Sequence, residues 1–206
     1  MSSTVVCIGT GPSLTLEQID VARQKGYRLF GCNRTWEIVP DLELLYGCNK
    51  GFWDTYHKDM DTPAEKWTTN LQAAMTYKLN WMGERYGAGL CTDPKVIHHG
   101  HGSGYSLVGM AHKMGAERIL LLGYDMRYAR DYDGKSQSIG STPRHYFGEY
   151  PAHLQHWPSV QVRNGVHVEL VDLYHSIHVQ GLVEIVNCTP GSALEDVIPS
   201  MDITDA

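Results

Sequence analysis

The sequence lacks several patterns that would assign a function directly. It has no run of about 18 apolar residues, so we expect no membrane-spanning helix. Neither a basic stretch nor a long apolar one stands near its start, so we expect no signal peptide. The five cysteines are an odd number without Cys-x-x-Cys spacing, which favours free thiols in a reducing compartment over a disulfide framework. These features predict a cytoplasmic protein.

Basic residues are few as well. The chain has 17 Lys and Arg against 23 Asp and Glu, a formal net charge of -6. A broad nucleic-acid interface usually needs a basic surface, so long duplex DNA is a less natural partner than a small molecule. Eleven histidines and twelve tyrosines indicate a polar pocket lined by aromatic rings.

The motifs of common nucleotide-binding proteins and serine hydrolases are missing. A Rossmann dinucleotide turn would need a third glycine where Leu14 stands. No Gly-Lys-Ser or Gly-Lys-Thr of a P-loop follows the first strand. The stretch GYSLVG lacks the Gly-x-Ser-x-Gly spacing of a nucleophile elbow. The function must therefore be inferred from the fold and from individual residues.

The stretch VVCIGTGPSLTLEQID, residues 5–20, predicts a strand, a glycine turn and a helix. Residues 5–8 suit a strand buried on both faces, and Thr15 with Gln18 has capping-box spacing. A turn of this kind exposes backbone N–H groups beside a helix N-terminus, where an anion is favoured. The alternative is that Gly9 and Gly11 only permit the backbone path.

Strands alternate with helices along the rest of the chain, which predicts an α/β fold with a doubly wound, mainly parallel, Rossmann-like sheet. We expect a single nucleotide-binding domain over residues 1–198, with an excursion or lid at 127–165 and a frayed tail at 199–206. Residues 83–95 read as a loop. The further strands are expected at 28–32, 42–48, 66–69, near 80, 95–100, 118–122 and 182–187, and helices at 70–77, 103–114 and 166–177.

Ligands of such sheets bind beyond the carboxyl ends of the strands. The residues at those ends are therefore the candidate binding residues. They are Gly9, Thr10, Gly11, Pro12 and Ser13, then Asn33, Asn49, His101, Ser103 and Gly104, then Tyr124, Asp125 and Asn187 to Ser192.

Three of the histidines, His98, His99 and His101, raise the question of a metal. No Cys, Asp or Glu lies close enough in sequence to complete a ligand set, so we predict no metal site. Facing the site, His101 would donate to a phosphate or sugar; a purely structural role is the alternative.

Asp125 follows a buried apolar strand, where catalytic or ligand-orienting carboxylates often lie; a capping role is the alternative.

The loop STPRHYFGEYP, residues 141–151, concentrates Arg144, His145 and Tyr146, and ordering such a loop is costly unless it contacts something. His145 is a candidate general base, because imidazole titrates near working pH; the alternative is a surface histidine.

Several of these segments resemble one group of proteins. IGTGPSL, FGCNRTW, VPDLELLYGCN, GSGYSLVGMAHKMGAERILLLGYDM and NCTPGSAL occur in the order seen in the bacterial sialyltransferase-like glycosyltransferases. The IGTGPSL turn also resembles that of the related archaeal 6-hydroxymethyl-dihydropterin pyrophosphokinases and flagellin-glycosylation proteins. The compact length and GSTPRHYFGEYP look most like small phage-encoded members.

The resemblance implies that Gly9, Gly11, Ser13 and Asn33 hold the ribose and phosphates of a nucleotide. The sialyltransferase-like members use a nucleotide-sugar donor without metal and a histidine base before the last strand. His145 matches that base best by position, with His153 and His156 behind it. The pterin branch would instead transfer pyrophosphate from ATP with Mg²⁺, and Asp125 would be its metal-side carboxylate.

We therefore predict a glycosyltransferase that moves a sugar from a nucleotide sugar to a hydroxyl, with a modified nucleobase or nucleotide as one candidate acceptor. His145 would take the acceptor proton, and Arg144, His101 or Tyr146 would offset charge on the leaving phosphates. The alternatives are an Mg²⁺-dependent pyrophosphokinase and a non-catalytic protein that binds a phage or host partner. Gly11→Val is expected to abolish nucleotide binding and leave the fold intact.

Overall fold

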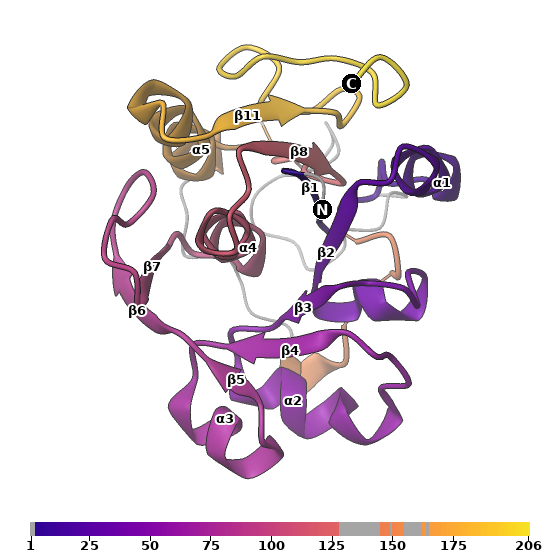
Figure 1. The fold of residues 1–206 in the computed structure, drawn as a ribbon, viewed down its shortest axis with the longest axis vertical. Coiled ribbons are helices and arrows are strands. Elements are labelled where there is room, and N and C mark those ends of the chain that lie inside the picture. The colour runs from indigo at the N-terminus through magenta and orange to yellow at the C-terminus, as the bar shows by residue number, and fades with distance from the viewer. Residues whose placement is uncertain (1–2, 128–144, 149, 155–161, 164) are drawn as a thin grey trace.

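A computed structural model describes residues 3–127, 145–148, 150–154, 162–163 and 165–206 (Figure 1). Its strands are β1 (Thr4–Ile8), β2 (Arg28–Cys32), β3 (Leu44–Tyr46), β4 (Glu65–Thr68), β5 (Asn80–Trp81), β6 (Gly83–Tyr86), β7 (Val96–His99), β8 (Arg118–Leu122), β9 (Val162–Arg163), β10 (Val166–His167) and β11 (Glu184–Asn187). Its α-helices are α1 (Leu16–Gln24), α2 (Lys50–Tyr56), α3 (Leu71–Tyr77), α4 (Ser103–Lys113) and α5 (Val168–Gln180).

Seven of the strands form one parallel sheet in the order β11-β8-β1-β2-β3-β4-β5. β1 lies in the interior of the sheet, with Cys7 opposite Phe30 of β2 and Leu121 of β8. Strands buried on both faces read as continuous apolar runs, as β1 and β8 do. The predicted α/β, doubly wound, Rossmann-like fold is confirmed.

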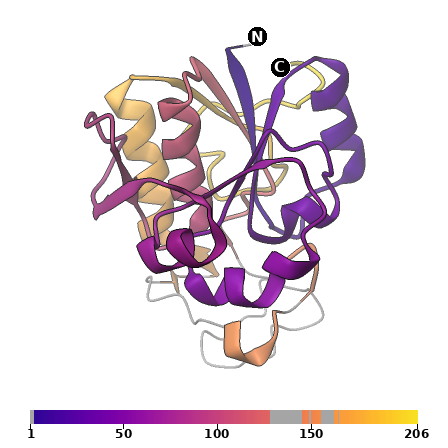
Figure 2. The same ribbon diagram turned by 60° about the horizontal axis from the view of Figure 1, so that its bottom comes forward.

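Helices cover both faces of this sheet, and successive residues of β1 show the division. Val5 and Cys7 pack in the cluster that contains the buried side chains of α4 and α5. Val6 and Ile8 pack in the other cluster, with α1, α2 and α3. Figure 2 shows α4 and α5 on one side of the sheet and α1 on the other. The core is thus two layers of side chains, one on each face of the sheet.

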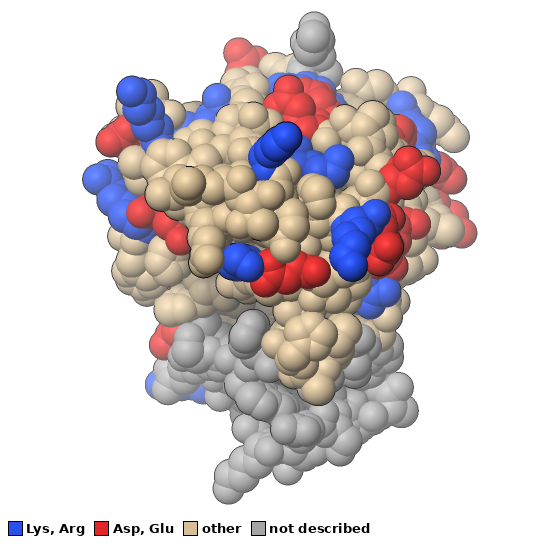
Figure 3. Space-filling model, turned by 90° about the horizontal axis from the view of Figure 1, so that it is seen from below, with Lys and Arg blue, Asp and Glu red and all other residues tan. Residues whose placement is uncertain are grey.

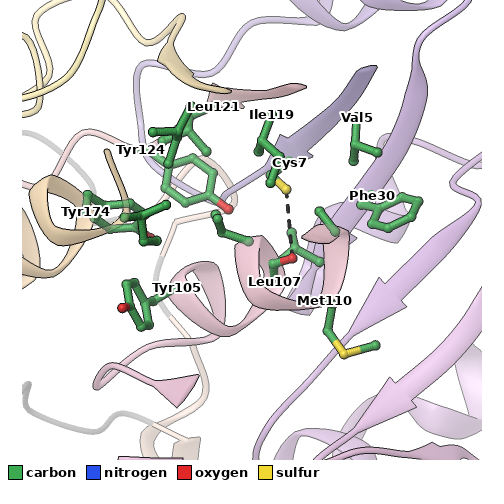
Figure 4. Packing of buried hydrophobic residues seen from close by; sticks show 14 of the residues in the cluster. Val5, Cys7, Phe30, Tyr105, Leu107, Met110, Ile119, Leu121, Tyr124 and Tyr174 are labelled. Atoms are coloured by element: carbon green, nitrogen blue, oxygen red, sulfur yellow. Dashed lines mark hydrogen bonds between the residues drawn. The ribbon is translucent and has the colours of Figure 1, made fainter. Parts of the chain in front are cut away.

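The first βα unit matches the sequence prediction closely. The Thr15 hydroxyl accepts from Gln18 N–H, and the Gln18 side chain accepts from Thr15 N–H, which completes the capping box. Gly26 follows the end of α1 with φ +68°, a conformation that glycine adopts without penalty. All five cysteines are free, and the Cys7 thiol donates to the Leu107 carbonyl inside the core (Figure 4). Cys7 is fully buried in the apolar core, where a thiol packs as a small hydrophobic group.

The structure differs from the expectation at 83–95, where residues 83–86 form β6 instead of a loop. β6 pairs in parallel with β7 as a separate two-stranded sheet, which lies beside α4 and away from the main sheet (Figure 1). Glycine and proline around this segment concealed the short strand. α4 begins at Ser103 as expected, with Gly102 as its N-cap, whereas α5 begins at Val168 after β10, two residues later than expected.

The tail is not frayed. Ser200 bridges to Asn187 of β11, and Ile203 is 2% exposed. The Ala206 carbonyl accepts hydrogen bonds from Lys25 Nζ and Tyr27 OH, both at 2.7 Å. Met201, Ile203 and Ala206 are the only hydrophobic residues of the segment 199–206, which is too weak a signal to predict this packing. The stretch after Asn187 forms turns.

The described part of the chain includes no helix that is both long and apolar enough to span a membrane. On the face seen in Figure 3, acidic and basic side chains are interspersed over the described surface. This face therefore carries no continuous basic band in its described part.

Candidate functional site

The site lies where the strand order reverses. The chain runs from β1 outward to β5 on one side and then returns to β8 and β11 on the other. Such a reversal leaves a crevice at the carboxyl ends of the two strands between which it occurs, here β1 and β8, and open α/β sheets bind ligands in this crevice. The switch-point cavity, of about 280 Å³, lies there between the turns that follow β1 and β8. Its lining includes Gly9 to Pro12, Cys32, Asn33, Gly102 to Gly104, Gly123 to Arg127, His145, His167 and Leu170.

The two turns that line this cavity are bonded to each other. Gly9 N–H donates to the Leu122 carbonyl at 2.8 Å, and Gly11 N–H donates to the Gly123 carbonyl at 2.9 Å. A Cβ on Gly9 or on Gly11 would lie 2.6 Å from the Gly123 oxygen, which real Cβ atoms do not approach. The glycines therefore allow two backbones to meet, as the alternative interpretation held.

The turn after β1 binds a carboxylate of the protein itself, that of Asp125. Ser13 Oγ donates to Asp125 Oδ2 at 2.9 Å, and Ser13 N–H also donates to this carboxylate. Burial raises the pKa of Asp125, and the two bonds from Ser13 act against this rise. The expectation that the turn presents free N–H groups is thus wrong at Gly9, Gly11 and Ser13.

A second cavity, of about 500 Å³, adjoins the first. Asparagines that follow three neighbouring strands contribute to it: Asn33 after β2, Asn49 after β3 and Asn70 after β4. We call it the β6–β7 cavity, because these two strands and the segment after them supply one wall. Its lining includes Asn33, Cys48, Asn49, Phe52, Asn70, Glu84, His99, His101 to Ser103, Ser106, His145, Tyr150 and Leu154. Volumes of about 300–1,000 Å³ are usual for small-molecule sites.

His145 lines both cavities, together with Asn33, Gly102 and Ser103. Its Nδ1 lies 3.1 Å from the Thr10 hydroxyl. Its ring meets the Tyr150 ring edge-on, with centroids 5.0 Å apart. These contacts orient the imidazole at the junction of the two cavities.

The N-terminus of α4 opens onto the same junction. Its N-cap residue is Gly102, so no side chain caps the first N–H groups of the helix. Gly102 and Ser103 line both cavities and form the wall that the two cavities share. The Tyr124 hydroxyl donates to the Gly104 carbonyl, and the Tyr124 ring packs edge-on against Tyr174 (Figure 4). This end of α4 is therefore held against the turn after β8, with its positive dipole end toward the cavities.

Backbone strain is concentrated at these cavities. Four described non-glycine residues have positive φ, and three of them line a cavity: Asn33 at +54°, His101 at +59° and Met126 at +52°. Such conformations cost about 1–3 kcal/mol each and gather at functional sites. The strain supports a binding or catalytic role for this region.

Most of the residues predicted from the sequence come together here. The lining contains Gly9, Thr10, Gly11, Pro12, Asn33, Asn49, His101, Ser103, Gly104, Tyr124, Asp125 and His145. Ser13 lies behind Asp125, and Tyr146 contributes its N–H to the Thr10 carbonyl while its ring packs in the core. Ser192 is buried and donates to the Tyr124 carbonyl, so it is a structural residue. Arg144 and His156 lie outside the described residues, and His153 contacts Thr55 away from both cavities.

Several lining residues are not among those predicted from the sequence. Asn70 stands at the start of the expected helix 70–77 and caps it, although it follows a strand end like Asn33 and Asn49, and that position was the available signal. Glu84 was missed because its strand was taken for a loop. Arg127 begins the expected excursion, where no apolar pattern placed it, and His167 lies in the expected helix 166–177, although α5 begins only at Val168.

His167 gives the site a measurable pH dependence. Burial lowers its pKa from 6.5 to about 4. The unfolded chain then binds more protons than the folded one between these values, so stability is lost as the pH falls through this window. We expect the free energy of unfolding to drop by up to about 3 kcal/mol between pH 7 and pH 4 on account of His167.

This expectation is checked by urea unfolding from pH 4 to pH 8. His167→Gln should flatten that part of the profile, and His178→Gln, on the exposed side of α5, should not. Equal profiles for wild type and His167→Gln would contradict it.

No family model and no curated protein sequence matches the chain. Several solved structures match the chain. The sialyltransferase CstII from Campylobacter jejuni, in complex with the substrate analogue cytidine-5'-monophosphate (CMP), aligns over 98% of this chain and 86% of its own, with a TM-score of 0.56 and 14% identity. The monofunctional α-2,3-sialyltransferase Cst-I from Campylobacter jejuni aligns over 99% and 82%, with a TM-score of 0.63 and 12% identity. The chain shares their fold.

A third structure is CstII in complex with a trisaccharide acceptor and CMP, with a TM-score of 0.54, 14% identity, and 98% and 88% of the two chains covered. At these identities the likeness is one of fold. The sequence resemblance to sialyltransferase-like proteins is therefore supported at the level of architecture. All three structures are sialyltransferases, so they give no support to the pyrophosphokinase branch.

Proposed function

We propose that this chain is a glycosyltransferase that transfers a sugar from a nucleotide sugar to a hydroxyl group. The observation that carries the proposal is the position of His145, whose ring lines two adjoining cavities at once. A transferase needs a donor site and an acceptor site that meet at a proton-accepting group. The fold shared with CstII and Cst-I agrees with this proposal.

In this proposal the nucleotide occupies the switch-point cavity. The first turn after β1 uses its N–H groups internally, so the phosphate would lie at the N-terminus of α4, beside Gly102 and Ser103. Arg127 lines the same cavity and would offset the negative charge. The solved relatives bind cytidine-5'-monophosphate and CMP-3FNeuAc, which makes cytidine nucleotides the first donors to test.

The donor sugar would point toward the shared wall and the acceptor would enter from the β6–β7 cavity. The acceptor oxygen forms a bond to the anomeric carbon while the bond from that carbon to the phosphate oxygen breaks. His145 takes the acceptor proton, and the phosphate leaves with the bonding electron pair. In the required tautomer, Nδ1–H donates to the Thr10 hydroxyl and Nε2 accepts the proton.

Calorimetry with CMP, UMP, GMP and ADP tests the donor site. We expect at least one of them to bind, and sugar transfer from the matching nucleotide sugar to continue in EDTA. If none binds at millimolar concentration, the proposal is wrong and a non-catalytic binding protein becomes the better interpretation.

The Mg²⁺-dependent alternative has less to support it. Asp125, its expected metal-side carboxylate, already accepts two hydrogen bonds from Ser13. Within the described residues, no three His, Cys, Asp or Glu side chains are grouped to hold a metal. Release of AMP from ATP that needs Mg²⁺ and is lost in Asp125→Asn would nevertheless replace glycosyl transfer by pyrophosphoryl transfer.

A further inference from the structure

The wall formed by β6 and β7 has a chemistry of its own. Side chains alternate along β6, so Glu84 and Tyr86 share one face and Arg85 takes the other. The Arg85 guanidinium lies against His98 and the Cys91 thiol. The only cation on this strand is therefore turned away from the side that Glu84 presents to the β6–β7 cavity.

The Glu84 carboxylate has no ion pair and no hydrogen bond with any residue in the part of the chain that the structure describes. Its charge nevertheless reaches into the cavity. Burial raises the pKa of Cys48, another lining residue, and the Glu84 charge adds to this rise. An unpaired carboxylate on a cavity wall repels anionic ligands and leaves acceptor oxygens for ligand hydroxyls.

The rest of the wall is formed by the imidazoles of His99 and His101 and by the start of α4, and Tyr86 lies beside these two rings. Tyr86 packs edge-on against His99 and His101, with ring centroids 5.6 and 5.3 Å away, and it is 63% exposed. Asn49 and Asn70 also contribute to the lining, and the Asn70 side chain caps α3. The described lining contains no lysine or arginine. Apart from the α4 N-terminus, which favours an anion, these groups suit a ligand with many hydroxyls and no negative charge.

We infer that the β6–β7 cavity is the acceptor subsite, that its ligand is an uncharged glycoside, and that Glu84 excludes anionic acceptors. Calling this ligand the acceptor rests on the proposed function. It narrows the acceptor class, because a nucleotide or nucleic acid would bring phosphate charges toward Glu84.

Binding of matched sugars tests this subsite without relying on turnover. The probes are the methyl glycosides of glucose and galactose and the corresponding methyl uronides, in which a carboxylate replaces the CH₂OH group. Their binding to the full chain is measured by saturation-transfer NMR at pH 8, above the usual titration range of imidazole. We expect at least one neutral glycoside to bind more tightly than its uronide.

The variant Glu84→Gln should reduce that preference at least roughly fivefold, the effect of one charge about 4 Å away in water. Glu117→Gln is the control, because Glu117 is exposed and directly precedes β8. It therefore lies at the amino ends of the strands, on the other side of the sheet from the cavities, which lie at the carboxyl ends. A uronide that binds wild type as well as its glycoside, or a preference that survives Glu84→Gln, would overturn the inference. So would the absence of any glycoside binding.

The nucleotide calorimetry separates the two proposals. Nucleotide binding without glycoside binding overturns the acceptor subsite and leaves the donor site standing. Glycoside binding with the expected Glu84 dependence, but without nucleotide binding, overturns the glycosyltransferase proposal and leaves a sugar-binding subsite.

Discussion

Replacing His145 with alanine is expected to slow sugar transfer by at least roughly a hundredfold, the low end for loss of a general base. The ring lies at the junction of the two cavities, and alanine offers no group to accept the proton. Nucleotide affinity should change little, because backbone groups and Arg127 are proposed to hold the phosphate. Steady-state rates with the donor identified by calorimetry, together with its dissociation constant, check both parts.

His153→Ala is the matched control for this prediction. His153 belongs to the same segment of the chain, but its Nε2 lies 3.0 Å from the Thr55 hydroxyl and its ring lines neither cavity. We expect full transfer activity in this variant. Wild-type rates in His145→Ala with a large loss in His153→Ala would assign the base to His153 and contradict the role given to His145.

The central sheet could be predicted because its signal is local. Continuous apolar runs such as Val5 to Ile8 identify buried parallel strands, and parallel strands place their carboxyl ends at one edge. This is why Asn33, Asn49, Ser103 and Asp125 could be assigned to one site without knowledge of their contacts.

The remaining parts of the site depend on contacts that are distant in sequence. Ser13 and Asp125 are 112 positions apart, and only the structure shows that each satisfies the other. Glu84 stands on a short strand whose pairing with β7 follows from tertiary contacts with α4. Ser192 had the right position for a ligand contact, but its hydroxyl is used by the Tyr124 carbonyl.

Gly11→Ala is expected to disturb both stability and nucleotide binding. The added Cβ would lie 1.8 Å from Asp125 Oδ2 and 2.6 Å from the Gly123 carbonyl oxygen. Neither atom can move aside easily, because Ser13 holds the carboxylate and Gly123 is backbone. Overpacking of this kind costs about 1–3 kcal/mol. The earlier expectation that a larger residue here would leave the fold intact therefore needs correction: the turns after β1 and β8 must separate, and the switch-point cavity changes shape with them.

Two further variants separate strain from loss of a ligand contact. Gly102→Ala places its Cβ in open space, so it should lose only the preference for glycine over alanine at an N-cap and should unfold at a higher temperature than Gly11→Ala. Adding Asp125→Ala to Gly11→Ala removes the nearer of the two clashes, so the double variant should recover part of the lost stability while the Gly123 contact at 2.6 Å persists. Thermal unfolding and nucleotide calorimetry on the four proteins measure these effects. The prediction is wrong if Gly11→Ala unfolds at the wild-type temperature and still binds nucleotide. That result would show that the two turns accommodate an added Cβ and that their close approach does not require glycine at position 11.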